Sequence, residues 1–229
     1  MVVVVSGGVV MIVTRKKPFD EIVSAIGNRC VLLVGCAECA AVCRTGGEPE
    51  VLEMKQKLEG VGISVADWLV LDPACDRRKS RLELKKRSEL LGSEGCCVVV
   101  LSCGDGVQTV AGVVPKGVEV IGGLESMFVG EQVSLGVFER RCVGCNECVV
   151  DRFVGFCPVS RCPKGMLNGP CGGVGADGSC EVSPEISCVW LEVVEKLKSL
   201  GRLDELDAIC PARDWSKSLV MRWEVGSDE

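Results

Sequence analysis

The residues best suited to chemistry in this chain are its 17 cysteines. In the second half, RCVGCNEC is followed by FCPVSRC, which gives the spacing C-x2-C-x2-C and then a Cys-Pro pair. Three thiolates at that spacing can turn inward on one loop and take three corners of an iron–sulfur cube, as in the bacterial ferredoxin run. The gap before Cys157 is longer than in that run, so the spacing indicates the kind of site and leaves the ligand sets open. The candidate ligands are Cys142, Cys145, Cys148, Cys157, Cys162, Cys171, Cys180 and Cys188.

The cysteine content favours metal-bound thiolates over disulfides. A disulfide scaffold is typical of short secreted chains with an even cysteine count, whereas this chain has 229 residues and an odd count. Residues 1–13 are apolar and precede the basic residues, the reverse of a secretory signal, and they are too few to cross a bilayer. We predict a β-strand or hairpin there, and a reducing, cytoplasmic location.

The absence of histidine excludes several kinds of site. It removes a histidine general base, a Ser-His or Cys-His nucleophile pair, a Rieske centre and mixed Cys/His zinc fingers. All-thiolate sites select iron–sulfur clusters or zinc. The net charge of −6 argues against nucleic acid as a partner, because nucleic-acid binding needs a basic surface.

Short apolar runs alternate with helical periodicity over residues 30–123. Such alternation predicts an open parallel α/β sheet, Rossmann-like or flavodoxin-like, covered on both faces. Neither G-x-G-x-x-G nor a Walker sequence is present, so a nucleotide site is not supported. The expected strands are 31–35, 68–71, 97–101 and 118–121, and the expected helices are 48–59, 77–91 and 104–114.

Five further cysteines follow the first three of these strands. Ligands of open parallel sheets bind at the carboxyl ends of the strands, so these cysteines should converge on one edge. Four of the five could hold a second cluster; the alternative is a set of small buried thiols. The five are Cys36, Cys39, Cys43, Cys75 and Cys103. By the same geometry Cys30, Cys96 and Cys97 lie at strand starts, where we expect core or inert side chains.

The two halves differ in character, and we place the domains at residues 1–137 and 138–229, with 124–140 connecting the halves. The second domain is rich in Gly and Pro, has little periodic signal before residue 189, and would need metal to fix it. Residues 189–200 predict an amphipathic helix that stops at Gly201, and 203–209 a short second helix. We expect Cys210 not to be a ligand and the tail after Trp215 to be frayed.

The segment RCVGCNEC…CPVSRCPKGMLNGPCGG…GSCEV…CVWLEVVEKLKSLGRLDEL…PARDWS resembles the methylenetetrahydrofolate reductase C-terminal domain. GCAECAAVC and LSCGDGVQTVA resemble the N-terminal half of the same proteins, which are the small iron–sulfur subunits (MetV type) of acetogens and related anaerobes. The resemblance covers nearly the whole chain after residue 30. Where the family usually carries Arg-Gln-Cys, this chain has Pro73-Ala74-Cys75.

The resemblance implies a redox subunit of an oxidoreductase complex in one-carbon metabolism. It would carry two or three [4Fe–4S] clusters and pass electrons to or from an FMN-containing TIM-barrel large subunit. Further electron-donor subunits are implied as partners, with no nucleic acid and no membrane insertion, and no catalytic residue is assigned to this chain. The methyl carrier, folate or methanopterin, is left open. Zinc can occupy one tetrad, and a zinc-thiolate protein, structural or activating a thiol or methyl group, is the alternative function. A dithiol oxidoreductase using Cys36 and Cys39 or Cys142 and Cys145 is a third.

Overall fold

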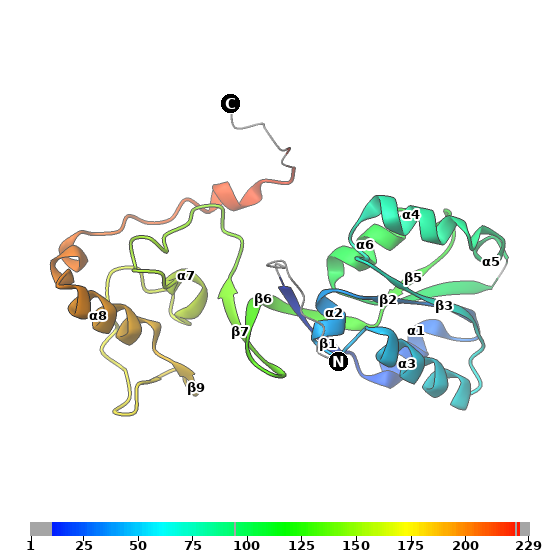
Figure 1. Cartoon of the computed structure of the whole chain (residues 1–229), viewed down its shortest axis with the longest axis horizontal. Coiled ribbons are helices and arrows are strands. Elements are labelled where there is room, and N and C mark those ends of the chain that lie inside the picture. Colours follow the sequence, from blue (N-terminus) through cyan, green and yellow to red (C-terminus); the bar gives the residue numbers. More distant parts are fainter. Residues whose placement is uncertain (1–10, 94, 223, 225–229) are drawn as a thin grey trace. The chain divides into compact units, whose positions relative to one another are not determined.

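The computed structural model describes residues 11–93, 95–222 and 224. The chain separates into two compact units, Met1–Phe138 and Glu139–Glu229 (Figure 1). Most of the strand or hairpin expected over residues 1–13 lies outside the described residues, but Met11–Lys16 forms the strand β1.

A four-stranded parallel sheet forms the centre of the first unit and confirms the predicted α/β class. The strand order is β3-β2-β4-β5, and every neighbouring pair is parallel. Residues of β2 and β4 are apolar on both faces and buried, because helices cover both sides of the sheet. The strands are β2 Cys30–Cys36, β3 Val65–Leu71, β4 Cys96–Leu101 and β5 Val120–Gly122.

Helices lie on both faces of this sheet, with α4 and α6 on one side and α1 and α3 on the other (Figure 1). In α3 the Glu50 carboxylate accepts a hydrogen bond from the Gly47 N–H at 2.9 Å, which caps the helix start. At the start of α4 the Asp76 carboxylate accepts hydrogen bonds from the backbone N–H groups of Arg78 and Lys79 and so caps that helix. The helices are α1 Phe19–Ile26, α2 Cys39–Val42, α3 Glu48–Gly60, α4 Arg77–Lys85, α5 Ser88–Leu91 and α6 Gly104–Ala111.

The single helix expected over residues 77–91 is wrong, because the chain forms α4 and α5 with a break between them. Arg87 leaves the helical conformation at the break. Its side chain donates to the Asp67 carboxylate on β3 at 2.7 Å and to the Glu83 carbonyl at 3.2 Å. The contact with Asp67 holds Arg87 against the sheet at the break between the two helices.

The segment 124–140, expected to connect the halves, contains the boundary between the two units and forms two strands. β6 Leu124–Ser134 pairs antiparallel with β1, and β7 Val137–Cys142 follows it in a second sheet of order β1-β6-β7. Gly136 has a φ of 78°, which suits the tight turn between β6 and β7. The partner strand β1 is about a hundred residues away in sequence, so local patterns could not reveal the pairing.

In the second unit, apolar burial is concentrated on one helix, α8 Val189–Leu200. Its Trp190 packs edge-on against Phe153 with ring centroids 5.2 Å apart, and its indole N–H donates to the Met166 carbonyl at 3.1 Å. The remaining core residues are Val189, Val193 and Leu197. The predicted helix over 189–200 and its stop at Gly201, which has a φ of 68°, are confirmed.

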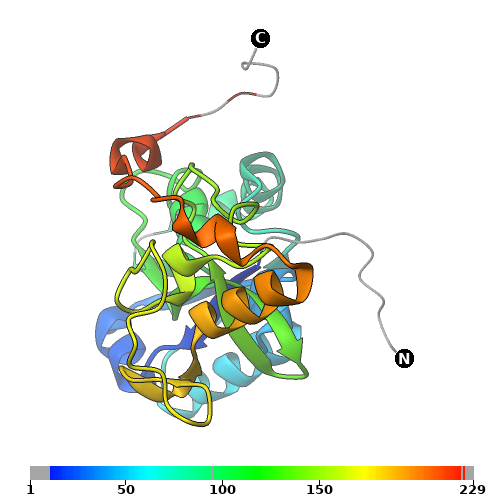
Figure 2. The ribbon, with the colours of Figure 1, turned by 90° about the vertical axis from the view of Figure 1, so that its left-hand side faces the viewer.

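The rest of this unit consists of short elements joined by Gly- and Pro-rich loops, and both views of the ribbon show these loops running beside α8 (Figures 1 and 2). The expected helix over 203–209 is a 3-10 turn, η1 Leu203–Asp207. The tail is not frayed at Trp215, because η2 Trp215–Leu219 forms another 3-10 turn. Across the described residues no helix is long and apolar enough to cross a membrane. The other elements are α7 Pro158–Arg161, β8 Ser179–Cys180 and β9 Ser183–Ser187.

Candidate metal centres

Three strand ends bring thiols to one edge of the parallel sheet. Cys36 is the last residue of β2, Cys75 follows β3, and Cys103 follows β4 at the start of α6. Cys39 opens α2, directly after β2. Because parallel strands end at the same edge, residues distant in sequence meet there. Cys36 and Cys103 are only 5% and 7% exposed.

The pKa shifts show that these thiols interact. Burial raises the pKa of Cys75, and the nearby Cys103, Cys36 and Cys39 raise it further. Burial also raises the pKa of Cys39, with Cys103 and Cys36 adding to the shift and a backbone hydrogen bond from Ile12 opposing it. Cys39 and Cys75 therefore each lie within electrostatic range of Cys36 and Cys103. Any metal that binds them must displace their protons.

We call Cys36, Cys39, Cys75 and Cys103 the edge tetrad. The fifth predicted ligand, Cys43, follows the last residue of α2 and is half-buried. It is not among the cysteines that raise the pKa of Cys39 or of Cys75. The structure thus brings four of the five expected residues to the same edge. Among the described residues no three Cys, Asp or Glu side chains are grouped closely enough to hold a metal ion, so the role of these cysteines as ligands stays a prediction.

Two glycines allow the loop that carries Cys39 and Cys43 to lie tightly against the strand ends. The Gly46 carbonyl accepts from the Cys36 N–H at 2.8 Å. A Cβ at Gly46 would overlap the Leu101 carbonyl oxygen and lie 2.8 Å from its carbon. A Cβ at Gly35 would lie 2.5 Å from Val51 and 2.6 Å from the Gly46 carbonyl oxygen. These two glycines therefore allow the loop backbone to pack closely against the strand ends beside the tetrad.

The opposite edge of the sheet holds a disulfide that the sequence reading did not foresee. Cys30 and Cys96 open neighbouring strands in direct register, and the structure joins them with a Cα–Cα separation of 4.6 Å. We had expected core or inert side chains there, and that expectation is correct only for Cys97, which is fully buried. Strand register, which decides whether two such sulfurs meet, cannot be read from cysteine spacing.

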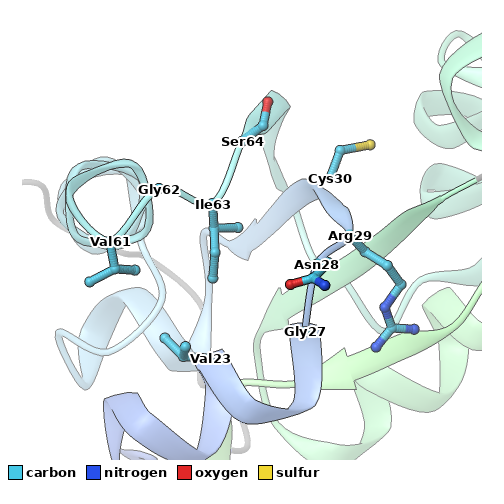
Figure 3. A pocket seen from close by; sticks show the side chains of 9 residues that line it. All are labelled: Val23, Gly27, Asn28, Arg29, Cys30, Val61, Gly62, Ile63 and Ser64. Carbon is cyan, nitrogen blue, oxygen red and sulfur yellow. The ribbon is translucent and has the colours of Figure 1, made fainter.

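An open pocket of about 510 Å³ lies beside Cys30 (Figure 3). Arg29 at its rim donates to the Ile26 carbonyl at 2.8 Å, to the Ala25 carbonyl and to Glu119. Its guanidinium is therefore engaged by the protein itself. None of the predicted metal ligands lines this pocket, so it contributes nothing to a metal centre.

The predicted ligands of the second unit lie on its loops and at the ends of short elements. Cys142 ends β7, Cys145 and Cys148 follow it, and Cys157 and Cys162 flank α7. Cys171 is on a loop, Cys180 is in β8, and Cys188 caps α8. Within residues 11–93, 95–222 and 224, no three Cys, Asp or Glu side chains are grouped closely enough to hold a metal ion. The ligand sets of this unit therefore stay predictions.

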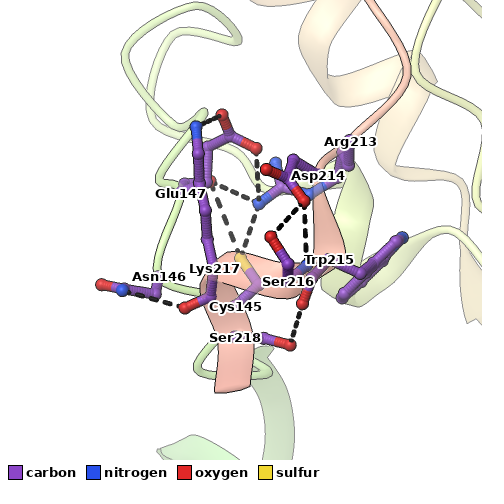
Figure 4. A network of polar contacts seen from close by, with 9 residues as sticks. All are labelled: Cys145, Asn146, Glu147, Arg213, Asp214, Trp215, Ser216, Lys217 and Ser218. Atoms are coloured by element: carbon purple, nitrogen blue, oxygen red, sulfur yellow. Dashed lines mark hydrogen bonds and ion pairs between the residues drawn. The ribbon is translucent and has the colours of Figure 1, made fainter. Parts of the chain in front are cut away.

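One residue near these cysteines was missed by the sequence reading. Arg213 is 5% exposed at its side chain, and its Nη2 donates to the Cys145 sulfur at 3.0 Å and to the Glu147 carbonyl at 2.6 Å (Figure 4). Its Nε and Nη1 are buried and have no hydrogen-bond partner among the residues that the structure describes. Arg213 belongs to the PARDWS segment that carries the family resemblance, but its proximity to Cys145 depends on the fold and cannot be read from that segment.

The surroundings of Arg213 fit a metal–thiolate group. A buried cation with two unpartnered donors is costly unless negative charge or acceptor atoms lie nearby. A cluster bound by thiolates carries both net negative charge and sulfur acceptors. The donor set of this unit is sulfur without histidine, which is the set that iron–sulfur clusters or zinc take.

Residues 121–216 match the family model described as methylene-tetrahydrofolate reductase C terminal. The matched segment runs from β5 to η2, so it contains every predicted ligand of the second unit together with Arg213. The edge tetrad lies before it. Searches of curated proteins and of solved structures gave no match.

Proposed function

We propose that this chain is the electron-transfer subunit of a methylenetetrahydrofolate or methylene-tetrahydropterin reductase. In this proposal it relays electrons to or from an FMN-bearing TIM-barrel subunit through thiolate-bound [4Fe–4S] clusters. The observation that carries it is the edge tetrad, in which the ends of β2, β3 and β4 bring four cysteines to one edge of the parallel sheet. The family match of residues 121–216 supports the link to the reductase.

The chain's own residues suit a relay better than a reaction at carbon. When bound, the clusters would supply one-electron chemistry. Cys36, Cys39, Cys75 and Cys103 would hold one cluster, and the buried positions of Cys36 and Cys103 would shield it from water. The chain has no histidine and no tyrosine to move protons. A flavin joins one-electron and two-electron steps, so the partner would carry out the hydride chemistry.

The test compares two buried cysteines of the same strand–helix segment. Cys103→Ser should lose about four irons per chain, because it removes one of the four tetrad sulfurs. Cys97→Ala is the matched control, since Cys97 is fully buried but lies in β4 away from the tetrad edge. It should keep the iron and lose on the order of 1 kcal/mol of stability.

Equal iron loss from both variants would show that the tetrad is not the site. Stoichiometric zinc in place of iron in the unmodified chain would favour the zinc-thiolate alternative, because four-thiolate zinc is redox-silent. The role of the partner is tested separately by co-purification and reconstitution. A chain that alone binds FMN stoichiometrically, or alone reduces the methylene carrier, would contradict the relay.

A further inference from the structure

We infer that Arg213 is the counter-cation of the centre that Cys145 helps to form, and that it raises the reduction potential of that centre. This inference rests on the proposed function, because it needs a redox-active centre in the second unit. It assigns to Arg213 a positioning and tuning role, in which it acts through the Cys145 sulfur.

The first step is the contact itself. The Nη2 donor lies 3.0 Å from the Cys145 sulfur, within the range of a hydrogen bond to sulfur. Donors to cluster sulfurs, and the charges near them, are among the factors that set reduction potentials. Cys145 is the middle sulfur of the C-x2-C-x2-C run. A donor to this sulfur therefore acts on the part of the sequence that most clearly indicates a cluster.

The second step is the incomplete neutralisation of the Arg213 charge by neighbouring carboxylates. Its carboxylate neighbour Glu147 has one oxygen 3.8 Å away, and the other oxygen is held by Lys217 at 2.6 Å. Glu147 is thus shared between two cations, and Arg213 keeps two buried donors without acceptors. Added negative charge beside Cys145 would satisfy this unbalanced cation.

The third step is how firmly the guanidinium is placed. Asp214 caps η2 by accepting from the Ser216 N–H at 3.0 Å, and the Asn146 amide donates to the Lys217 carbonyl at 3.0 Å (Figure 4). The Trp215 ring lies 5.6 Å from the guanidinium carbon. The Asn146 contact joins the turn after Arg213 to the loop that carries Cys145. The guanidinium is therefore already positioned beside the Cys145 sulfur, whatever the redox state of the centre.

The surroundings strengthen the effect. Arg213 lines a pocket of about 410 Å³ together with the apolar residues Val159, Leu167 and Trp215. Electrostatic interactions are stronger in an apolar environment than in water. A charge held here should therefore act on Cys145 with little screening by salt.

The direction of the effect follows from charge balance. When the centre takes one electron from a reduced iron–sulfur or flavin donor, the donor is oxidised and the iron is reduced. No bond breaks, and the centre becomes more negative by one charge. The nearby cation stabilises this reduced form more than the oxidised form. Removing the cation should therefore make the centre harder to reduce.

The experiment is an anaerobic redox titration of the full chain, followed by electron paramagnetic resonance, on Arg213→Gln. The equilibrium should shift at least tenfold toward the oxidised form, which is about 59 mV for one electron. Only one of the two redox transitions should move, so the edge tetrad serves as an internal reference. Arg202→Gln is the matched control, because Arg202 pairs with Glu205 on the surface and the charge change is the same. Its transitions should stay in place.

Arg213→Lys separates charge from shape, since it keeps the charge but loses the planar fork. Its potential should fall between those of the unmodified chain and Arg213→Gln. If Arg213→Gln loses iron while Arg213→Lys keeps it, the requirement for charge is upheld. If both lose iron, the side chain acts by shape, and the inference is wrong.

An unchanged potential in an iron-loaded Arg213→Gln chain would also overturn the inference and leave the proposed function standing. If the unmodified chain shows no redox transition at all, the proposed function is wrong, and the inference that rests on it is wrong as well.

Discussion

Replacing Gly46 with alanine should destroy the edge tetrad without removing a sulfur. The new Cβ would lie 2.8 Å from the Leu101 carbonyl carbon and 3.0 Å from the Ala40 side chain, and it would overlap the Leu101 oxygen. An ordinary contact between carbons is about 3.5 Å, so the loop must retreat by at least ~0.7 Å. Functional sites tolerate displacements of about 0.5 Å. The Cys39 sulfur should therefore be carried out of range of Cys103.

The energetic cost follows from the same contacts. Overpacking of a buried site costs about 1–3 kcal/mol. The hydrogen bond from the Cys36 N–H to the Gly46 carbonyl, worth about 1 kcal/mol, would be strained as well. We expect a loss of about 2–4 kcal/mol in the free energy of unfolding, measured by denaturant titration, and a loss of about four irons per chain.

Gly60→Ala is the matched control for this substitution. Gly60 ends α3, and a Cβ there would have no heavy atom within 4 Å. The alanine should keep the iron and change stability by less than about 1 kcal/mol. If Gly46→Ala keeps both its iron and its stability, the close approach of this loop to β4 is not what positions the tetrad.

Three further predictions concern stability. Trp190→Ala should cost about 3–5 kcal/mol, seen as faster proteolysis of the second unit, because Trp190 is the largest buried side chain on α8. Lys16 and then Lys57 lower the pKa of Glu53 from 4.5 to about 2, so its contribution is present above pH 4.5 and is lost as the pH falls through 2. Because Glu53 is 44% exposed, Glu53→Gln should cost less than about 1 kcal/mol at pH 7, and the cost should shrink as the pH falls from 4.5 toward 2, as measured by urea unfolding. Metal chelation should speed hydrogen exchange in α8 more than in β2, since the second unit has a small apolar core.

The sequence predicts the parallel sheet and α8 well, because each has a strong local signal. The residues of β2 and β4 form short runs of Val and Leu that are buried on both faces, and α8 shows a clear helical stripe ended by Gly201. Parallel topology then places Cys36, Cys75 and Cys103 at one edge. That inference needs only strand direction, so it does not depend on exact strand boundaries.

Features that depend on register or on distant contacts could not be predicted in this way. The pairing of β1 with β6 joins segments about a hundred residues apart, and the break at Arg87 depends on Asp67 of β3. The Cys30–Cys96 disulfide depends on two strands being in direct register. Arg213 contacts Cys145 although the two are 68 positions apart, with α7, β8, β9 and α8 between them. In each case the deciding interaction is tertiary, and no local propensity encodes it.

Elemental analysis of the full chain, purified without oxygen, tests the central claim most directly. Iron, sulfide and zinc would be quantified per chain, and the electron paramagnetic resonance spectrum of the reduced protein would be recorded on the same sample. The proposed function predicts about eight irons with matching sulfide, as two four-iron clusters require, and a spectrum of reduced clusters. Fewer than about four irons per chain, with stoichiometric zinc in their place, would contradict it.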